Sequence, residues 1–140
     1  MTHVDHLLVS RFYQISKIAV ILLESTMPKI KNEELKTIIS NQMSTYDVLS
    51  KECCTMAKSH LVALPDNAYF KRCRELIVEA FNNISSVNLQ TLIACTTLLS
   101  LNALTEIYDV EMANSETINL GKHLQNIIAN NLQVLTEIKL

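Results

Sequence analysis

The residues of this sequence that could carry chemistry are its glutamates and histidines, because carboxylates and imidazoles bind metals inside helical proteins. Di-metal centres in helix bundles use a Glu from each of two helices and a Glu-x-x-His motif from each of the other two. No glutamate of this chain is followed by a histidine three positions later. The candidate metal ligands that remain are Glu24, Glu106 and His123. We expect Glu24 and Glu106 to be solvated helix-end charges, and we predict no bound metal and no other cofactor.

A second group of candidates is polar and falls in rows that helical spacing predicts to be buried: Gln42, Tyr46, Thr96 and Asn131, together with His123. A buried polar group without a partner costs about 1–3 kcal/mol. We therefore expect these side chains to form a hydrogen-bonded layer that fixes how the helices meet. The alternative is a pocket beside Gln42 and Tyr46 that holds a small apolar ligand. For His123, a structural role on a helix is commoner than ligation.

The rest of the sequence offers no catalytic set. A single glycine excludes a glycine-rich phosphate loop, and no nucleophile can be paired with a base. The net charge is −2 and the basic residues are scattered, so we expect no binding to nucleic acid or to a membrane surface. We predict a protein that is not an enzyme.

Hydropathy and cysteine usage predict a cytoplasmic protein. The apolar run from Ile18 to Leu23 is far shorter than the roughly 20 residues that span a bilayer. Asp5, Arg11 and Lys17 interrupt the region that a signal peptide would make hydrophobic. The four cysteines form no C-x-x-C pair, and we expect them to be small core thiols of a reducing compartment.

The elements that must position these residues are predicted to be helices. With 49% hydrophobic residues, one glycine and two prolines in 140 residues, the composition favours one helical domain over a strand-rich one. A first helix is expected from about Val4 to Met27, ended by Pro28, and a second from a cap at Asn32 to about Val62. The clearest apolar row lies on this second helix: Leu35, Ile39, Gln42, Tyr46, Leu49, Cys53 and Met56.

The second half of the chain predicts two more helical segments. One begins with a cap at Asp66, is interrupted near residues 82–86, and continues from Val87 to about Val110. The other begins at a cap at Asn114 or Ser115 and extends to the C-terminus. Its predicted buried row is Leu120, Leu124, Ile127, Asn131, Val134 and Ile138. We predict a single domain over 1–140: an antiparallel up-and-down four-helix bundle with a break in the third helical segment near residues 82–86.

The first predicted helix suggests how the chain could act. Around Ile18–Leu23 the apolar surface extends nearly all the way round, which predicts either a central position or contact with a second chain. We predict a homo-oligomer, most simply a homodimer, whose interface includes Ile18, Ile21 and Leu22. The predicted function is that of a non-enzymatic protein acting through protein contacts, with the identity of any further partner left open.

Two stretches carry a family resemblance. Residues 30–36, Ile-Lys-Asn-Glu-Glu-Leu-Lys, followed by Gln42 and Tyr46, resemble a stretch in an uncharacterised family of small ferritin-like helical proteins from low-GC Gram-positive bacteria. Residues 89–109 and the terminal helix are similar to that family in layout. The resemblance implies a ferritin-like four-helix bundle with no assigned activity. Gln42, Tyr46 and His123 stand where metal-binding ferritins would have Glu-x-x-His, so iron chemistry is not implied. A degenerate metal-binding protein using Glu24, Glu106 and His123 remains the alternative.

Overall fold

The protein is all-helical over the residues that the structure, a computed structural model, describes: 1–107 and 113–139, with the side chains of 104–107 excepted. Five α-helices pack against one another: α1 (His3–Thr26), α2 (Glu33–Ser59), α3 (Asn67–Phe81), α4 (Leu89–Ile107) and α5 (Ser115–Glu137). A short 3₁₀ helix, η1 (Met27–Lys29), follows α1. The described part of the chain contains no strand, and the predicted all-α class is confirmed.

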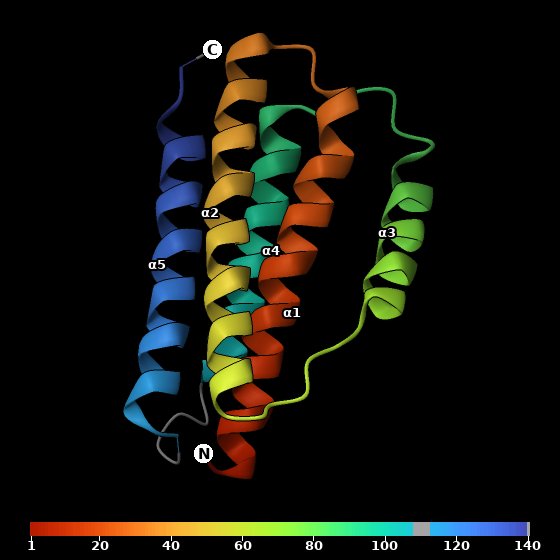
Figure 1. The fold of residues 1–140 in the computed structure, drawn as a ribbon. Helices are drawn as coiled ribbons and strands as arrows, with labels where there is room; N and C mark the ends of the chain where they lie inside the picture. The colour runs from red at the N-terminus through yellow and green to blue at the C-terminus, as the bar shows by residue number, and fades with distance from the viewer. Residues whose placement is uncertain (108–112, 140) are drawn as a thin grey trace.

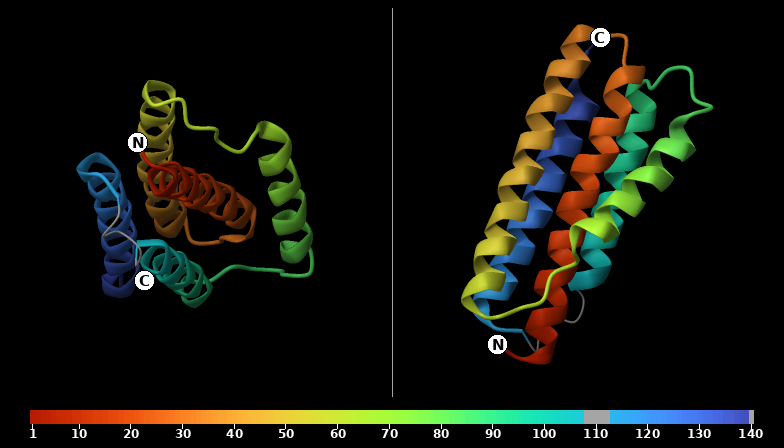
Figure 2. Two further views of the ribbon diagram at one scale, coloured as in Figure 1. Left: turned by 90° about the horizontal axis from the view of Figure 1, so that it is seen from below. Right: turned by 45° about the vertical axis from the view of Figure 1, so that its right-hand side comes forward.

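Helix α1 is the centre of the arrangement, because it contacts each of the other four helices. Figure 2 shows α2, α5, α4 and α3 placed around it. Consecutive helices run in opposite directions, so α2 and α4 are parallel to each other (Figure 1). The Ile18–Leu23 run is too short to cross a membrane. The whole helical span His3–Lys29, which is α1 with η1, meets the length and composition that a membrane span requires. The core helix of a folded domain and an N-terminal signal sequence both meet the same criterion. In this structure α1 lies at the centre of the other helices (Figure 2).

Side-chain caps explain where the helices begin. Asn32 Oδ1 accepts a hydrogen bond from the backbone N–H of Leu35 (3.0 Å), and Asp66 Oδ1 accepts one from that of Tyr69 (2.9 Å). Asn114 caps α5 in the same way. Each such cap contributes about 1 kcal/mol because it satisfies an N–H that has no partner in the first helical turn. These three caps were predicted from the sequence.

The predicted row on α2 is buried from Leu35 to Cys53, and then continues through Ala57, with Met56 only half-buried. On α5 the row was predicted wrongly in its second half. Val134 is 45% exposed, whereas its neighbour Leu135 is fully buried. The true row steps by fours and threes: Leu120, Leu124, Ile128, Asn131 and Leu135. Apolar neighbours at 127/128 and 134/135 offered the sequence two rows, and packing selects one.

The predicted interruption lies where expected, but it separates two helices. Helix α3 ends at Phe81 and α4 begins at Leu89, and the two run in opposite directions (Figure 1). The segment between them crosses one end of the molecule, where the Val87 N–H donates to the Lys29 carbonyl (2.9 Å) and the Val87 side chain is buried. This leaves α3 packed on the outside of α1, with only Phe70 and Phe81 fully buried. The break was predicted as a kink or a short loop within one helical segment. The loop is present, but the two pieces are separate antiparallel helices and not one segment (Figure 1).

Candidate functional site

Three of the five predicted core polar residues, Gln42, Tyr46 and Asn131, meet between α2 and α5. Gln42 is 4% exposed and donates from Nε2 to the Asn131 carbonyl (3.0 Å). Asn131 donates from Nδ2 to Thr45 Oγ1 (3.0 Å), and Thr45 donates to the Gln42 carbonyl (2.6 Å). These bonds join α2 to α5 at residues far apart in the sequence, which fixes the register of the two helices.

Two atoms of this layer are buried without a hydrogen bond to any described residue: Gln42 Oε1 and the Tyr46 hydroxyl. Tyr46 is 1% exposed, and burial raises its pKa, while the neighbouring Asn131 side chain lowers it by less. Asn131 Nδ2 carries two hydrogens and donates one of them to Thr45 Oγ1. Neither Gln42 nor Tyr46 lines the groove described below, the cavity beside Ile21 or the cavity beside Leu61. The predicted apolar pocket is none of these.

His123, also predicted in a buried row, is instead 44% exposed in its side chain and pairs with Glu52 at the surface, so that prediction is wrong. Thr96 is buried on α4 but does not join the layer. Its hydroxyl donates to the Leu92 carbonyl of its own helix (2.9 Å). A threonine can satisfy itself in this way on any buried helix face, so its position in the row does not predict a partner on another helix.

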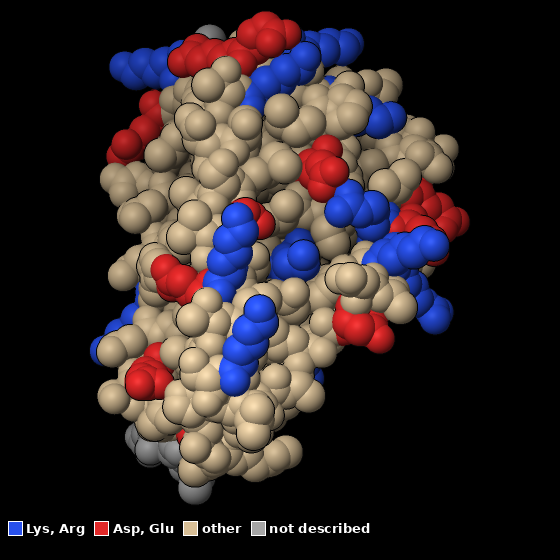
Figure 3. All heavy atoms as spheres, in the orientation of Figure 1, with Lys and Arg blue, Asp and Glu red and all other residues tan. Residues whose placement is uncertain are grey.

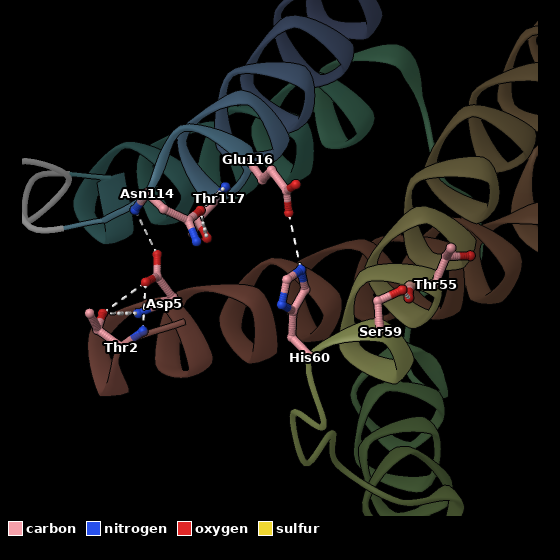
Figure 4. Close-up of polar contacts among 8 residues, drawn as sticks. All are labelled: Thr2, Asp5, Thr55, Ser59, His60, Asn114, Glu116 and Thr117. Carbon is pink, nitrogen blue, oxygen red and sulfur yellow. Dashed lines mark hydrogen bonds and ion pairs between the residues drawn. The ribbon is translucent and has the colours of Figure 1, made fainter.

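Nearer the other end of the same two helices, two histidine–glutamate pairs cross from α2 to α5. His60 Nε2 lies 3.1 Å from Glu116 Oε2, and His123 Nδ1 lies 2.8 Å from Glu52 Oε2. Figure 4 shows His60 facing Glu116 from the end of α2. The pairs are partly solvent-exposed, so each contributes at most about 1 kcal/mol.

A surface groove runs between the two pairs. Two adjoining cavities of about 620 and 340 Å³ share Glu52, Met56 and Glu116 as lining residues. Val48 and Met56 contribute apolar lining. Thr55 and Ser59 also line the groove, but the Ser59 hydroxyl donates to the Thr55 carbonyl (3.1 Å) and no described contact links it to His60 (Figure 4). The groove therefore presents carboxylates, imidazoles and apolar surface without an activated nucleophile among the residues drawn.

Glu24 and His123, two of the three candidate metal ligands, have different partners in the structure. Glu24, on α1, is paired with Arg74 of α3 (2.8 Å), whereas His123, on α5, is paired with Glu52. The side chain of Glu106 lies outside the described residues. Within the described part, no group of three or more His, Cys, Asp and Glu side chains is placed to hold a metal ion.

A buried carboxylate that was not predicted as a site residue holds the N-terminus of α1 against the start of α5. Asp5 is 1% exposed. Its Oδ2 atom accepts from the N–H and hydroxyl of Thr2 (2.9 and 2.8 Å), and its Oδ1 atom accepts from the Asn114 N–H (2.8 Å; Figure 4). Burial on its own raises the pKa of Asp5, but the hydrogen bonds from Asn114 and Thr2 outweigh it and hold the pKa below the ordinary value.

The three predicted interface residues differ in exposure. Ile21 is 3% exposed and lines a cavity with Phe70 and Arg74 of α3, so this chain itself covers it. Ile18 and Leu22 are half-buried. Ile21 was wrongly placed on the outside because the sequence did not show that α3 packs on this side of α1 (Figure 2).

All four cysteines are free thiols. Cys53 is buried in the α2 row, and burial, with Cys54 and Glu52 nearby, raises its pKa to about 12. Such a thiol stays protonated and behaves as a compact apolar side chain. Cys54, Cys73 and Cys95 are half-buried, so the predicted core role holds fully only for Cys53.

Sequence reasoning missed both Asp5 and the histidine–glutamate pairs. For Asp5 a signal was present, because Thr2-x-x-Asp5 has the spacing of a capping box, which the structure shows at the start of α1. The pairs join residues 56 and 71 positions apart, and only the register of α2 on α5 brings them together.

Comparison with known proteins adds no relative. No protein-family model, no curated protein and no solved structure matches this chain.

Proposed function

We propose that this protein is not an enzyme, and that it acts through protein contacts as a cytoplasmic homo-oligomer. The observation that carries the proposal is the exposure of large apolar side chains on two outer helices. On α3, Tyr69, Leu76 and Val78 are 42%, 58% and 45% exposed, and on α4 Leu98 and Leu101 are 61% and 54% exposed. Single exposed apolar residues are ordinary, but clusters on one element mark interaction surfaces. The four free thiols support a reducing compartment.

The arrangement of the helices supports a ferritin-like architecture for this proposed protein. In it, α1, α2, α4 and α5 form the four-helix bundle, and α3 belongs to the crossover from α2 to α4. A crossover of this kind makes the second and third bundle helices parallel, and ferritin-like folds contain one long crossover. The parallel directions of α2 and α4 support this assignment (Figure 1).

Sedimentation velocity tests the proposal. Measured from about 1 to about 200 μM, a range that brackets a micromolar dissociation constant, the wild-type chain should show a weight-average mass that rises above the 15.8 kDa of one chain. A mass that stays at one chain over the whole range would contradict the homo-oligomer.

A second candidate function is the binding of a small, partly apolar ligand in the groove between α2 and α5. Its favouring observation is the cavity of about 620 Å³, a volume in the range of ligand sites. Titration with the fluorescent probe 1-anilinonaphthalene-8-sulfonate should give saturable binding that Met56→Glu abolishes and Leu76→Glu leaves intact. Equal binding by all three proteins would remove the groove as the site.

A further inference from the structure

Helix α4 differs from the other helices in its charge. Residues 80–105 of the sequence contain no Asp, Glu, Lys, Arg or His. Over residues 89–103, where the side chains of α4 are described, both the buried and the exposed faces of this helix are therefore uncharged. Charges of both signs are spread over the face formed by α1, α2 and α3 (Figure 3).

Two rows with the same spacing lie on opposite sides of α4. The inner row, Leu92, Thr96, Leu99 and Ala103, is buried against the rest of the chain. The outer row, Gln90, Ala94, Thr97 and Leu101, steps by four, three and four, and all of its members are exposed, as is the adjacent Leu98. Steps of four and three are the spacing with which one helix packs along another.

We infer that the outer row of α4, with Leu98 beside it, is the surface through which two copies of this chain associate. The inference rests on the homo-oligomer proposed above and names its interface. In a two-fold contact the same patch faces itself, so a charged residue near the axis meets its own like charge. An uncharged helix face avoids that repulsion. An uncharged face also does not attract a partner of opposite charge. We therefore take a second copy of this chain as the occupant.

The size of the patch sets the strength of the contact. Fifteen helical residues extend about 22 Å, and a strip one helix wide is small beside the roughly 800 Å² per partner of a stable interface. The dimer is therefore a weak one, in equilibrium with the monomer at micromolar concentrations.

Leu98→Glu and Leu76→Glu are a matched pair of variants, because the two leucines are 61% and 58% exposed on different outer helices. Leu98→Glu puts two carboxylates into the dimer, and we expect it to raise the dissociation constant about tenfold or more. Leu76→Glu should leave the constant unchanged. Thr97→Glu, an exposed change on the outer row that improves helix propensity, should act like Leu98→Glu if that variant folds poorly.

Sedimentation equilibrium on the three variants and the wild type, with circular dichroism to confirm helix content, separates the outcomes. Weakening by Leu98→Glu or Thr97→Glu, with Leu76→Glu unaffected, supports the inference. A wild-type dimer that neither α4 variant weakens, or that Leu76→Glu weakens equally, overturns the α4 interface and leaves the homo-oligomer standing. A wild-type monomer at every concentration overturns both.

Discussion

Helix α5 is joined to its neighbours by two kinds of polar contact that have the same length and different surroundings. The Asp5 Oδ1 atom lies 2.8 Å from the Asn114 N–H, and His123 Nδ1 lies 2.8 Å from Glu52 Oε2. Asp5 is 1% exposed, whereas the side chains of His123 and Glu52 are 44% and 43% exposed. Water can replace the partner of Glu52, whereas the folded chain already excludes water from almost all of the Asp5 side chain. Burial, and not distance, sets what each contact contributes to stability.

The largest effect should follow from Asp5→Asn. The amide nitrogen cannot accept the hydrogen bonds that Thr2 or Asn114 donate, so the buried side chain at position 5 keeps only part of these bonds and turns an NH₂ group toward an N–H. We expect the free energy of unfolding to fall by about 3 kcal/mol, measured by urea denaturation.

Asp66→Asn is the matched control, because Asp66 caps α3 at the surface and asparagine is an equally good cap. It should change stability by less than about 0.5 kcal/mol. Equal losses in both variants would break the comparison, since burial would then not matter.

The contribution of Asp5 should also depend on pH in a known direction. Its pKa in the folded chain lies below the ordinary 3.8, so the unfolded chain binds this proton more readily. The stability that Asp5 gives is therefore present above that value and is lost as the pH falls through the lower, folded-state pKa. The difference in unfolding free energy between wild type and Asp5→Asn should be constant from neutral pH down to about pH 5 and shrink at lower pH. A difference that grows in acid would refute the lowered pKa.

Two adjacent residues of the buried layer should respond with opposite signs. Thr45→Val removes the acceptor of the Asn131 amide and should cost about 1 kcal/mol. Tyr46→Phe removes a buried hydroxyl without a described partner and should raise the free energy of unfolding by about 1 kcal/mol. Urea denaturation of both variants measures this, and a loss of stability in Tyr46→Phe would show that the hydroxyl is bonded.

The smallest effect should come from the exposed pairs. His123→Ala should change the unfolding free energy by less than about 0.5 kcal/mol at neutral pH, because solvent screens its contact with Glu52. Thermal unfolding at low and high salt checks this, and a loss near that of Asp5→Asn would place the exposed pair among the main stabilising contacts.

Much of the fold could be predicted because α2 carries one dominant apolar row, and because α2, α3 and α5 each begin at a recognisable cap. Where two rows compete, as at Val134 and Leu135, periodicity cannot choose, and packing against the other helices decides. The separation of α3 from α4 could not be predicted either. The serines and asparagines of residues 82–86 are compatible with a kink in one helix and with a reversal of chain direction. The structure shows a reversal, in which the Val87 N–H is bonded to the Lys29 carbonyl.

The candidate site could be predicted only for polar residues that lie in the buried rows of their helices. Gln42 and Asn131 were expected in a polar layer and meet there. Glu52 and His123 were not predicted to pair, because their contact depends on the register of α2 against α5. The packing of the two apolar rows sets that register more than either residue does. Ile21 was predicted at an interface with a second chain but is 3% exposed within this one, and it lines a cavity together with Phe70 and Arg74 of α3.

The central claim is that this chain acts through contact with copies of itself. Its most direct test is the weight-average mass of the wild-type protein by sedimentation equilibrium at neutral pH. The account predicts a mass that rises with concentration from 15.8 kDa toward twice that value. A mass fixed at 15.8 kDa up to about 200 μM, where a micromolar dimer would be largely assembled, would contradict it.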